Sequence, residues 1–164
     1  MDEHVIIKQY LTFNVGGDDY AINVGNIREV LEFQSVSRVP RMPDYMRGII
    51  NLRGSVVPVI DLKTKFDLGQ TEKSIDTSVI VTELKIGDDD VVLGLLTDAV
   101  NEVVDIDETD IEPTPNIGTT IDSSFIKGMG KKDDKFIIIL NINRIFSNSE
   151  VRELTTESIS EGES

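Results

Sequence analysis

Residues 46–62 read MRGIINLRGSVVPVIDL, and this stretch decides the fold of the chain. Two short runs rich in aliphatic residues flank the tripeptide Arg53-Gly54-Ser55. This pattern predicts a β-hairpin, because Gly54 can adopt the positive φ that a tight turn often needs. Arg53 then lies at the tip, where a rigid hairpin holds its charge out. Pro58 in the second run predicts an edge strand or a neighbouring bulge, since proline has no N–H for a central strand.

The same plan occurs twice in the chain. Residues 46–66 align with residues 126–146 at a constant offset of 80 without a gap, with a glycine and a phenylalanine in common. Residues 21–31 align with residues 94–104 at an offset of 73. Two copies are too few for a solenoid, which needs three or more. The repeat therefore predicts two small β-rich units, and it leaves open whether the units exchange strands.

Outside the central hairpin the pattern predicts further hairpins and two short helices. Alternating residues around polar turns predict hairpins within residues 10–24 and 78–96. Apolar residues at helical spacing between Val24 and Leu31 predict a short helix capped by Asn23. In the second unit, Thr97 or Asp98 can cap a second short helix that runs through Val104.

Composition limits the classes of protein that fit. The chain has 164 residues and a net charge of −14, from 30 acidic and 16 basic side chains. Such acidity disfavours binding to nucleic acid or to anionic lipid. The longest aliphatic and aromatic run, residues 136–140, is far shorter than the roughly 20 residues that span a bilayer. Residues 136–142 predict the most buried strand. Residues 1–4 are polar and unlike a secretory signal, so we expect a cytoplasmic protein.

Side chains for catalysis are scarce. The chain has no Cys, and its one His, His4, lies in the polar N-terminal end. Residues 105–110 resemble a calcium loop but lack glycine at the sixth position, and residues 128–132 do not fit a phosphate-binding loop. Asp61 follows a predicted strand, where a turn or helix cap is the simplest role. The residues therefore predict no catalytic, cofactor or metal site.

A chain of this kind is typical of a binding module. Arg53 fits an interface hot spot, since arginine is enriched there, and fits equally well a solvated turn residue. Gly48 indicates either a close approach of another backbone or a bulge. The apolar residues of the two predicted helices are expected in the core, and any that is exposed becomes an interface candidate: Ile27, Val30, Val100 and Val103.

The motif at residues 46–62 closely resembles the central motif of the CheW family, the coupling proteins of bacterial chemotaxis, and the resemblance extends from about Gln9 to Phe146. It implies an all-β fold with short helices, in which two five-stranded Src-homology-3-like β-barrels form a pseudo-repeat. The boundaries expected on this basis are residues 8–147 for the domain, 8–70 and 75–147 for its units, and 148–164 for an acidic tail.

The resemblance also implies a function. CheW proteins are non-catalytic adaptors that join the regulatory domain of the histidine kinase CheA to the cytoplasmic tips of chemoreceptors, so recruitment to receptor arrays is expected. The family's interaction positions carry over to two sets of residues. The kinase-facing set is Gly48, Glu29 and Arg47, and the receptor-facing set is Arg53, Ile27, Val100 and Val103. Two alternatives stay open, a small metabolite-binding β-barrel and an adaptor of a chemosensory pathway that does not control swimming.

Overall fold

The computed structural model describes residues 5–86, 88–113, 123–147 and 150. Within these residues the chain is mostly β, with a few single helical turns between strands. The strands are β1 (Ile7–Val15), β2 (Asp18–Asn23), β3 (Ile27–Glu32), β4 (Met46–Leu52), β5 (Ser55–Asp61), β6 (Ser78–Ile86), β7 (Asp89–Thr97), β8 (Ala99–Asp107), β9 (Ile126–Lys132) and β10 (Lys135–Leu140). The helical turns are η1 (Val24–Asn26), α1 (Leu62–Lys65), η2 (Glu108–Asp110), η3 (Ser123–Phe125) and α2 (Ile142–Ile145).

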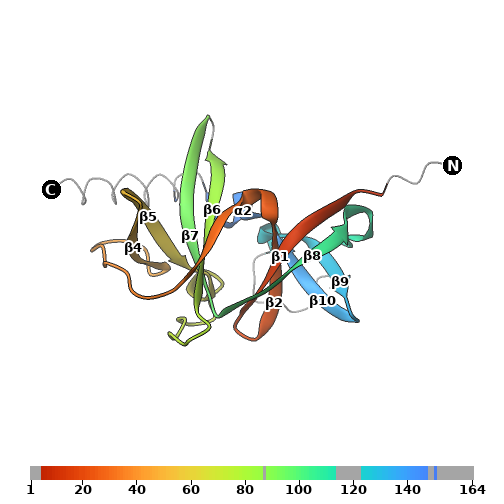
Figure 1. The fold of residues 1–164 in the computed structure, drawn as a ribbon, viewed down its shortest axis with the longest axis horizontal. Helices are drawn as coiled ribbons and strands as arrows, with labels where there is room; N and C mark the ends of the chain where they lie inside the picture. Colours follow the sequence, from red (N-terminus) through yellow and green to blue (C-terminus); the bar gives the residue numbers. More distant parts are fainter. Residues whose placement is uncertain (1–4, 87, 114–122, 148–149, 151–164) are drawn as a thin grey trace.

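In the described part of the chain the strands form two five-stranded sheets. Sheet A has the order β8-β1-β2-β10-β9, and sheet B has the order β3-β6-β7-β5-β4. Neighbouring strands are antiparallel, except for the parallel pairs β10–β2 and β5–β7. Figure 1 shows the two groups of strands lying beside each other. Each sheet thus combines strands from both halves of the sequence, the point that the repeat alone left open.

The two sheets match strand by strand along the predicted repeat. The segment β4-β5-α1 corresponds to β9-β10-α2 at the offset of 80. Replacing each strand of sheet B by its counterpart gives the strand order of sheet A. The duplication seen in the sequence is therefore also a duplication in space, with each copy contributing to both sheets.

One pair of backbone hydrogen bonds closes each sheet at equivalent places. After β3, Ser37 pairs with Ile49 of β4, and the two N–H···O distances are 2.9 and 2.8 Å. After β8, Glu112 pairs with Met129 of β9 in the same way, at 3.0 and 2.8 Å. Each bridge joins the segment that follows the first strand in the sheet order to the last strand, which closes the sheet as a barrel requires.

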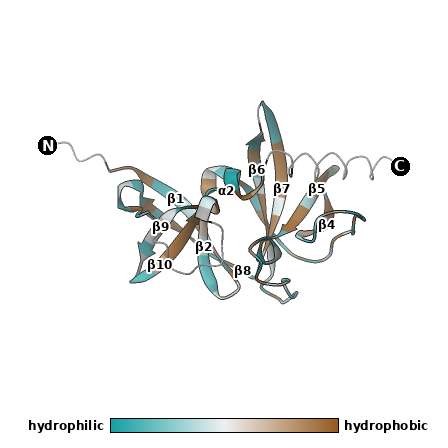
Figure 2. Cartoon of the chain, turned by 180° about the vertical axis from the view of Figure 1, so that it is seen from behind, coloured by the Kyte–Doolittle hydropathy of each residue, from teal (hydrophilic) through white to brown (hydrophobic). Residues whose placement is uncertain are grey.

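The largest cluster of buried side chains joins residues of both sheets. Phe13 and Tyr20 of sheet A stack at 6.0 Å between ring centroids, and Tyr20 contacts Phe66 at 5.4 Å. The Tyr20 hydroxyl is buried and has no hydrogen-bond partner, and burial raises its pKa well above the ordinary value. Figure 2 shows hydrophobic colour along β10, which lies between β2 and β9. Two smaller buried clusters remain, one among the strands of sheet A and one among those of sheet B.

The prediction of two short helices is wrong, because both segments are mainly β-strands. Residues 27–32 form β3 and residues 99–107 form β8, so the helical turn capped by Asn23 ends at Asn26. In β3 the side chains alternate between partly buried and exposed, with Ile27 and Leu31 on the inner side and Val30 on the outer. Pairing of β3 with β6 and of β8 with β1 supplies the backbone partners that a helix would otherwise provide.

Two smaller expectations had different outcomes. Phe136, expected in the most buried strand, has 61% of its surface exposed, because β10 is buried only from Ile137 onward. The bulge expected near Pro58 is confirmed, since the β4–β5 register shifts between Met46 and Gly48 opposite Val59. The tail expected at residues 148–164 lies outside the described residues except for Glu150.

Candidate functional site

The predicted hairpin is present, with a tighter turn than the sequence indicated. β4 ends at Leu52 and β5 begins at Ser55, so only Arg53 and Gly54 form the loop. Both have positive φ, +51° and +87°, as in the turns that match the twist of a β-hairpin. The side chain of Asn51 accepts a hydrogen bond from the Gly54 N–H at 2.9 Å and fixes the turn. Arg53 is therefore held at the tip, with 74% of its side chain exposed.

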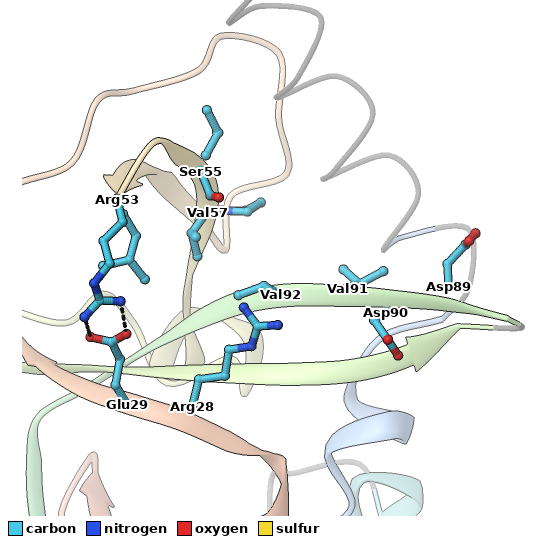
Figure 3. A pocket seen from close by; sticks show the side chains of 12 residues that line it. Arg28, Glu29, Arg53, Ser55, Val57, Asp89, Asp90, Val91 and Val92 are labelled. Carbon is cyan, nitrogen blue, oxygen red and sulfur yellow. Dashed lines mark hydrogen bonds and ion pairs between the residues drawn. The ribbon is translucent and has the colours of Figure 1, made fainter.

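Arg53 reaches from the tip to Glu29 of β3. Its two terminal nitrogens donate to the two carboxylate oxygens of Glu29 at 2.6 and 3.0 Å, as Figure 3 shows. The hydrogen bond from Arg53 lowers the pKa of Glu29, and the same contact raises the pKa of Arg53. Bidentate pairs of this kind fix the plane of a guanidinium as well as its position. The structure thus brings together two residues that the sequence analysis assigned to different interfaces.

An open cleft of about 580 Å³ lies beside this ion pair. Its apolar lining includes Val56 and Val57 of β5 and Val91 and Val92 of β7. Its polar lining comes from Ser55 and from charged residues: Arg28, Glu29, Arg53, Asp89 and Asp90. Arg28 is itself paired with Glu83 of β6 through hydrogen bonds of 3.1 and 3.3 Å. An open cleft with a mixed apolar and charged lining suits a protein surface better than a small substrate.

Gly48 and Arg47 serve contacts within the chain. A Cβ on Gly48 would lie 2.6 Å from the carbonyl oxygen of Ser37, so the closing bridge leaves no space for a side chain. Arg47 donates to the buried carboxylate of Asp61 at 3.1 Å and to the carbonyl of Thr71 at 3.0 Å. Gly48 is buried and Arg47 is about 29% exposed, so any contact of this region with a partner involves mainly the neighbouring surface.

The four apolar candidates divide into two kinds. Ile27 and its repeat counterpart Val100 pack against the largest core cluster. Val30 and its counterpart Val103 are 42% and 50% exposed on β3 and β8. By the criterion set from the sequence, the exposed pair are the interface candidates. Val30 was absent from the predicted receptor-facing set, although the offset of 73 that links it to Val103 was a signal for it.

The counterpart of the Arg53 turn carries the opposite charge. Asp133 and Asp134 form the β9–β10 turn with φ of +51° and +64°. Asp133 and Glu102, the counterpart of Glu29, line a hollow of about 280 Å³. The position of Arg53 is therefore taken by a carboxylate in the second copy, where Lys135 also lines the hollow.

The described residues offer little for catalysis. Among them, no three side chains of the types that bind metals are grouped closely enough to hold an ion, and no helix is long and apolar enough to cross a membrane. His4 lies outside the described residues. Asp61, expected as a cap, does cap α1, accepting from the Lys63 N–H at 3.1 Å.

A pair of interlocked five-stranded β units with exposed apolar and charged strand surfaces defines a protein-docking module. Comparison with known proteins makes this specific. The model of the CheW-like domain matches residues 9–150, and the chain belongs to that family. It is therefore a scaffolding protein of chemotaxis signalling, and the family is non-catalytic.

The sequences of several CheW proteins match this chain over most of their own length. The chemotaxis protein CheW of Klebsiella aerogenes is 30% identical over 88% of this chain and 84% of its own. The CheW proteins of Helicobacter pylori and Thermotoga maritima are 33% and 32% identical, over 85% and 88% of this chain and 81% and 91% of theirs. The crystal structure of the scaffolding protein TtCheW from Thermoanaerobacter tengcongensis superimposes with a TM-score of 0.77 at 39% identity, covering 90% of this chain and 92% of that one.

Proposed function

We propose that this chain couples the cytoplasmic tips of chemoreceptors to the regulatory domain of the histidine kinase CheA. Membership of the family implies that the chain binds partners in a chemotaxis signalling complex. The kinase and the receptor are the particular partners that we propose. The protein would then be cytoplasmic and reach the membrane arrays through its partners. A bridge of this kind transmits a signal only if its contacts differ between two states of a partner.

The observation that carries the proposal is the ordered, exposed Arg53 at the rim of a cleft lined by both apolar and charged side chains. Its bond to Glu29 holds the guanidinium in one plane while leaving 74% of the side chain accessible. A partner carboxylate can therefore meet a donor that has already lost much of its conformational freedom. We assign Arg53 and Val103 to the receptor side, together with the partly exposed Ile27 and Val100, and we assign Glu29, Arg47 and the surface next to the buried Gly48 to the kinase side. A stable complex of this kind would bury roughly 1,200–2,000 Å² in total.

The Arg53–Glu29 pair allows a test that separates a docking role from a structural one. Arg53→Glu places two carboxylates together and is expected to weaken co-sedimentation with receptor-tip fragments at least tenfold. The double variant Arg53→Glu/Glu29→Arg restores an ion pair in reverse orientation. If Arg53 contacts the receptor, the double variant stays defective while its thermal stability returns to that of wild type.

The matched control uses an exposed apolar residue outside the candidate surface. Ile75 is 87% exposed, and Ile75→Glu is expected to leave receptor and kinase binding unchanged. Val103→Glu, at a side chain that is 50% exposed, is expected to reduce receptor binding without unfolding the chain. Full receptor binding by a folded Arg53→Glu protein, or recovery of binding in the charge-swapped double variant, would remove Arg53 from the proposed interface.

A further inference from the structure

A lysine lies among aromatic rings where the two sheets meet. Lys65 belongs to α1, which follows β5 of sheet B, and its side chain is only 11% exposed. The Nζ atom lies 4.4 Å from the centroid of the Tyr45 ring, 5.3 Å from that of Phe146 and 5.7 Å from that of Phe125. Phe125 ends η3, just before β9 of sheet A, and Phe146 follows α2, just after β10 of the same sheet. Ring faces within about 6 Å attract a cation, and more strongly where water is excluded.

The two copies of the internal repeat differ at the position of Lys65. Tyr45 corresponds to Phe125 at the offset of 80, and the contact of Tyr45 with Phe146 at 6.0 Å corresponds to that of Phe66 with Phe125 at 6.3 Å. The counterpart of Lys65 is Ile145, which is 1% exposed. One copy of the repeat thus places an apolar side chain at this position, and the other places an ammonium group.

The counter-charge comes from Glu150, beyond the last strand. Its Oε2 accepts from the Nζ of Lys65 at 2.7 Å and from the hydroxyl of Tyr45 at 2.7 Å. Its Oε1 accepts from the Ser147 N–H at 3.0 Å, and the Ser147 hydroxyl accepts from the Glu150 N–H at 3.1 Å. Burial raises the pKa of Glu150, but the hydrogen bonds from Lys65, Tyr45 and Ser147 outweigh it and lower that pKa to about 2.

The site is built without Glu150. The three rings and the lysine lie in turns and helical turns next to strands of both sheets, and all three rings make cation–π contacts with Lys65. Removing the carboxylate would leave a nearly buried ammonium group without its counter-ion, which is strongly unfavourable. A carboxylate from another molecule that reaches Lys65 and Tyr45 would restore the contacts that are lost.

We propose that Tyr45 and Lys65 form a binding site for a single carboxylate at the junction of the two sheets, and that Glu150 occupies it as an intramolecular ligand. The occupant is the carboxylate of Glu150. Because this ligand is covalently attached, its high effective concentration excludes a free carboxylate ligand from the wild-type site. The contacts of this site lie within the chain and do not depend on the kinase or the receptor.

A peptide supplied in trans tests this proposal on the full chain. The probe is a synthetic peptide with the sequence of residues 147–164, titrated into ¹⁵N-labelled protein while backbone amide shifts are followed. Glu150→Gln is expected to bind the peptide with saturable shifts at Tyr45 and Lys65. The wild-type chain should bind it at least tenfold more weakly, and a peptide with Gln at the position of Glu150 should show the same weakening on the variant.

Two further variants test the receiving side chains. Lys65→Met/Glu150→Gln removes the cation but keeps an apolar side chain among the rings, so it is expected to fold and to lose peptide binding. Tyr45→Phe/Glu150→Gln removes only the hydroxyl and is expected to weaken binding severalfold. The proposal is overturned by equal binding to wild type and Glu150→Gln, by no binding to Glu150→Gln, or by undiminished binding to the folded Lys65→Met double variant.

Discussion

Replacing Asp61 by alanine should destabilise the fold more than any other single loss of a helix cap in the described chain. The carboxylate is 1% exposed and accepts from the Lys63 N–H, from Arg47 at 3.1 Å, and from both the backbone N–H and the hydroxyl of Thr71 at 2.8 and 2.6 Å. These contacts tie β4, β5 and the segment after α1 to one buried charge. Loss of the carboxylate leaves Arg47 and Thr71 without their main acceptor.

The magnitude follows from the contacts that are lost. A helix cap is worth about 1 kcal/mol. A hydrogen bond to a charged group contributes about 1.5–3 kcal/mol, and such contributions overlap within one network. Breaking a buried pair on one side costs about 3–5 kcal/mol, so we expect a loss of about 4 kcal/mol for Asp61→Ala.

The repeat supplies the matched control. Asn141 is the counterpart of Asp61 and caps α2 by accepting from the Asn143 N–H at 3.2 Å. Asn141→Ala removes a cap without the network around it, so we expect a loss of about 1 kcal/mol. The difference between the two variants, about 3 kcal/mol, measures the network alone.

Urea denaturation followed by far-ultraviolet circular dichroism provides the assay. With a slope of about 2 kcal/mol per molar urea, the midpoint should fall by about 2 M for Asp61→Ala and by about 0.5 M for Asn141→Ala. The slopes of wild type and variants must agree for this comparison. If the two variants lose the same stability within about 0.5 kcal/mol, the network around Asp61 does not contribute in the way its geometry indicates.

Three further predictions test other parts of the fold. The pKa of Glu150 is lowered from an ordinary 4.5 to about 2, so its stabilising contribution is complete above pH 4.5 and is lost as the pH falls toward 2; acid titration of Glu150→Gln should show a smaller loss over that range. Tyr20→Phe removes a buried hydroxyl without a partner, so its thermal midpoint should equal or exceed that of wild type, and a clear decrease would indicate a partner for that hydroxyl. Gly48→Ala and Gly128→Ala would place a Cβ 2.6 and 2.7 Å from the carbonyls of Ser37 and Glu112, so urea midpoints should fall by more than about 0.5 M for both, and unchanged midpoints would contradict the tight closure.

The sequence predicted the features that depend on neighbouring residues. The turn at Arg53-Gly54 and the cap at Asp61 follow from local backbone preferences, and the structure contains both. The repeat predicted that β4 and β9 are counterparts, because side-chain patterns survive duplication. The helix expected between Val24 and Leu31 failed because apolar residues at that spacing also suit a strand whose inner side faces the core.

What the sequence could not supply were contacts between distant segments. Arg53 and Glu29 are separated by 24 residues, and the closure of sheet B, which brings the ends of its strand order together, places their side chains 2.6 Å apart. Lys65 and Glu150 are 85 residues apart, and nothing in the acidic composition after Phe146 distinguished that glutamate from its neighbours. The pairing of Arg47 with Asp61 was likewise hidden, although both residues lie within the most informative stretch.

The charges on the two copies of the repeat bear directly on how one small scaffold can serve different partners. Both residues have positive φ at Arg53-Gly54 and at Asp133-Asp134, yet one turn presents a paired arginine and the other presents two aspartates, of which Asp133 lines a hollow with Glu102. Specificity requires contacts that favour one partner and disfavour another. A partner surface that offers a carboxylate to Arg53 would meet like charge at the opposite hairpin. The two turns therefore occupy equivalent places in the duplicated plan but carry opposite charges, which disfavours the binding of one partner surface to both turns.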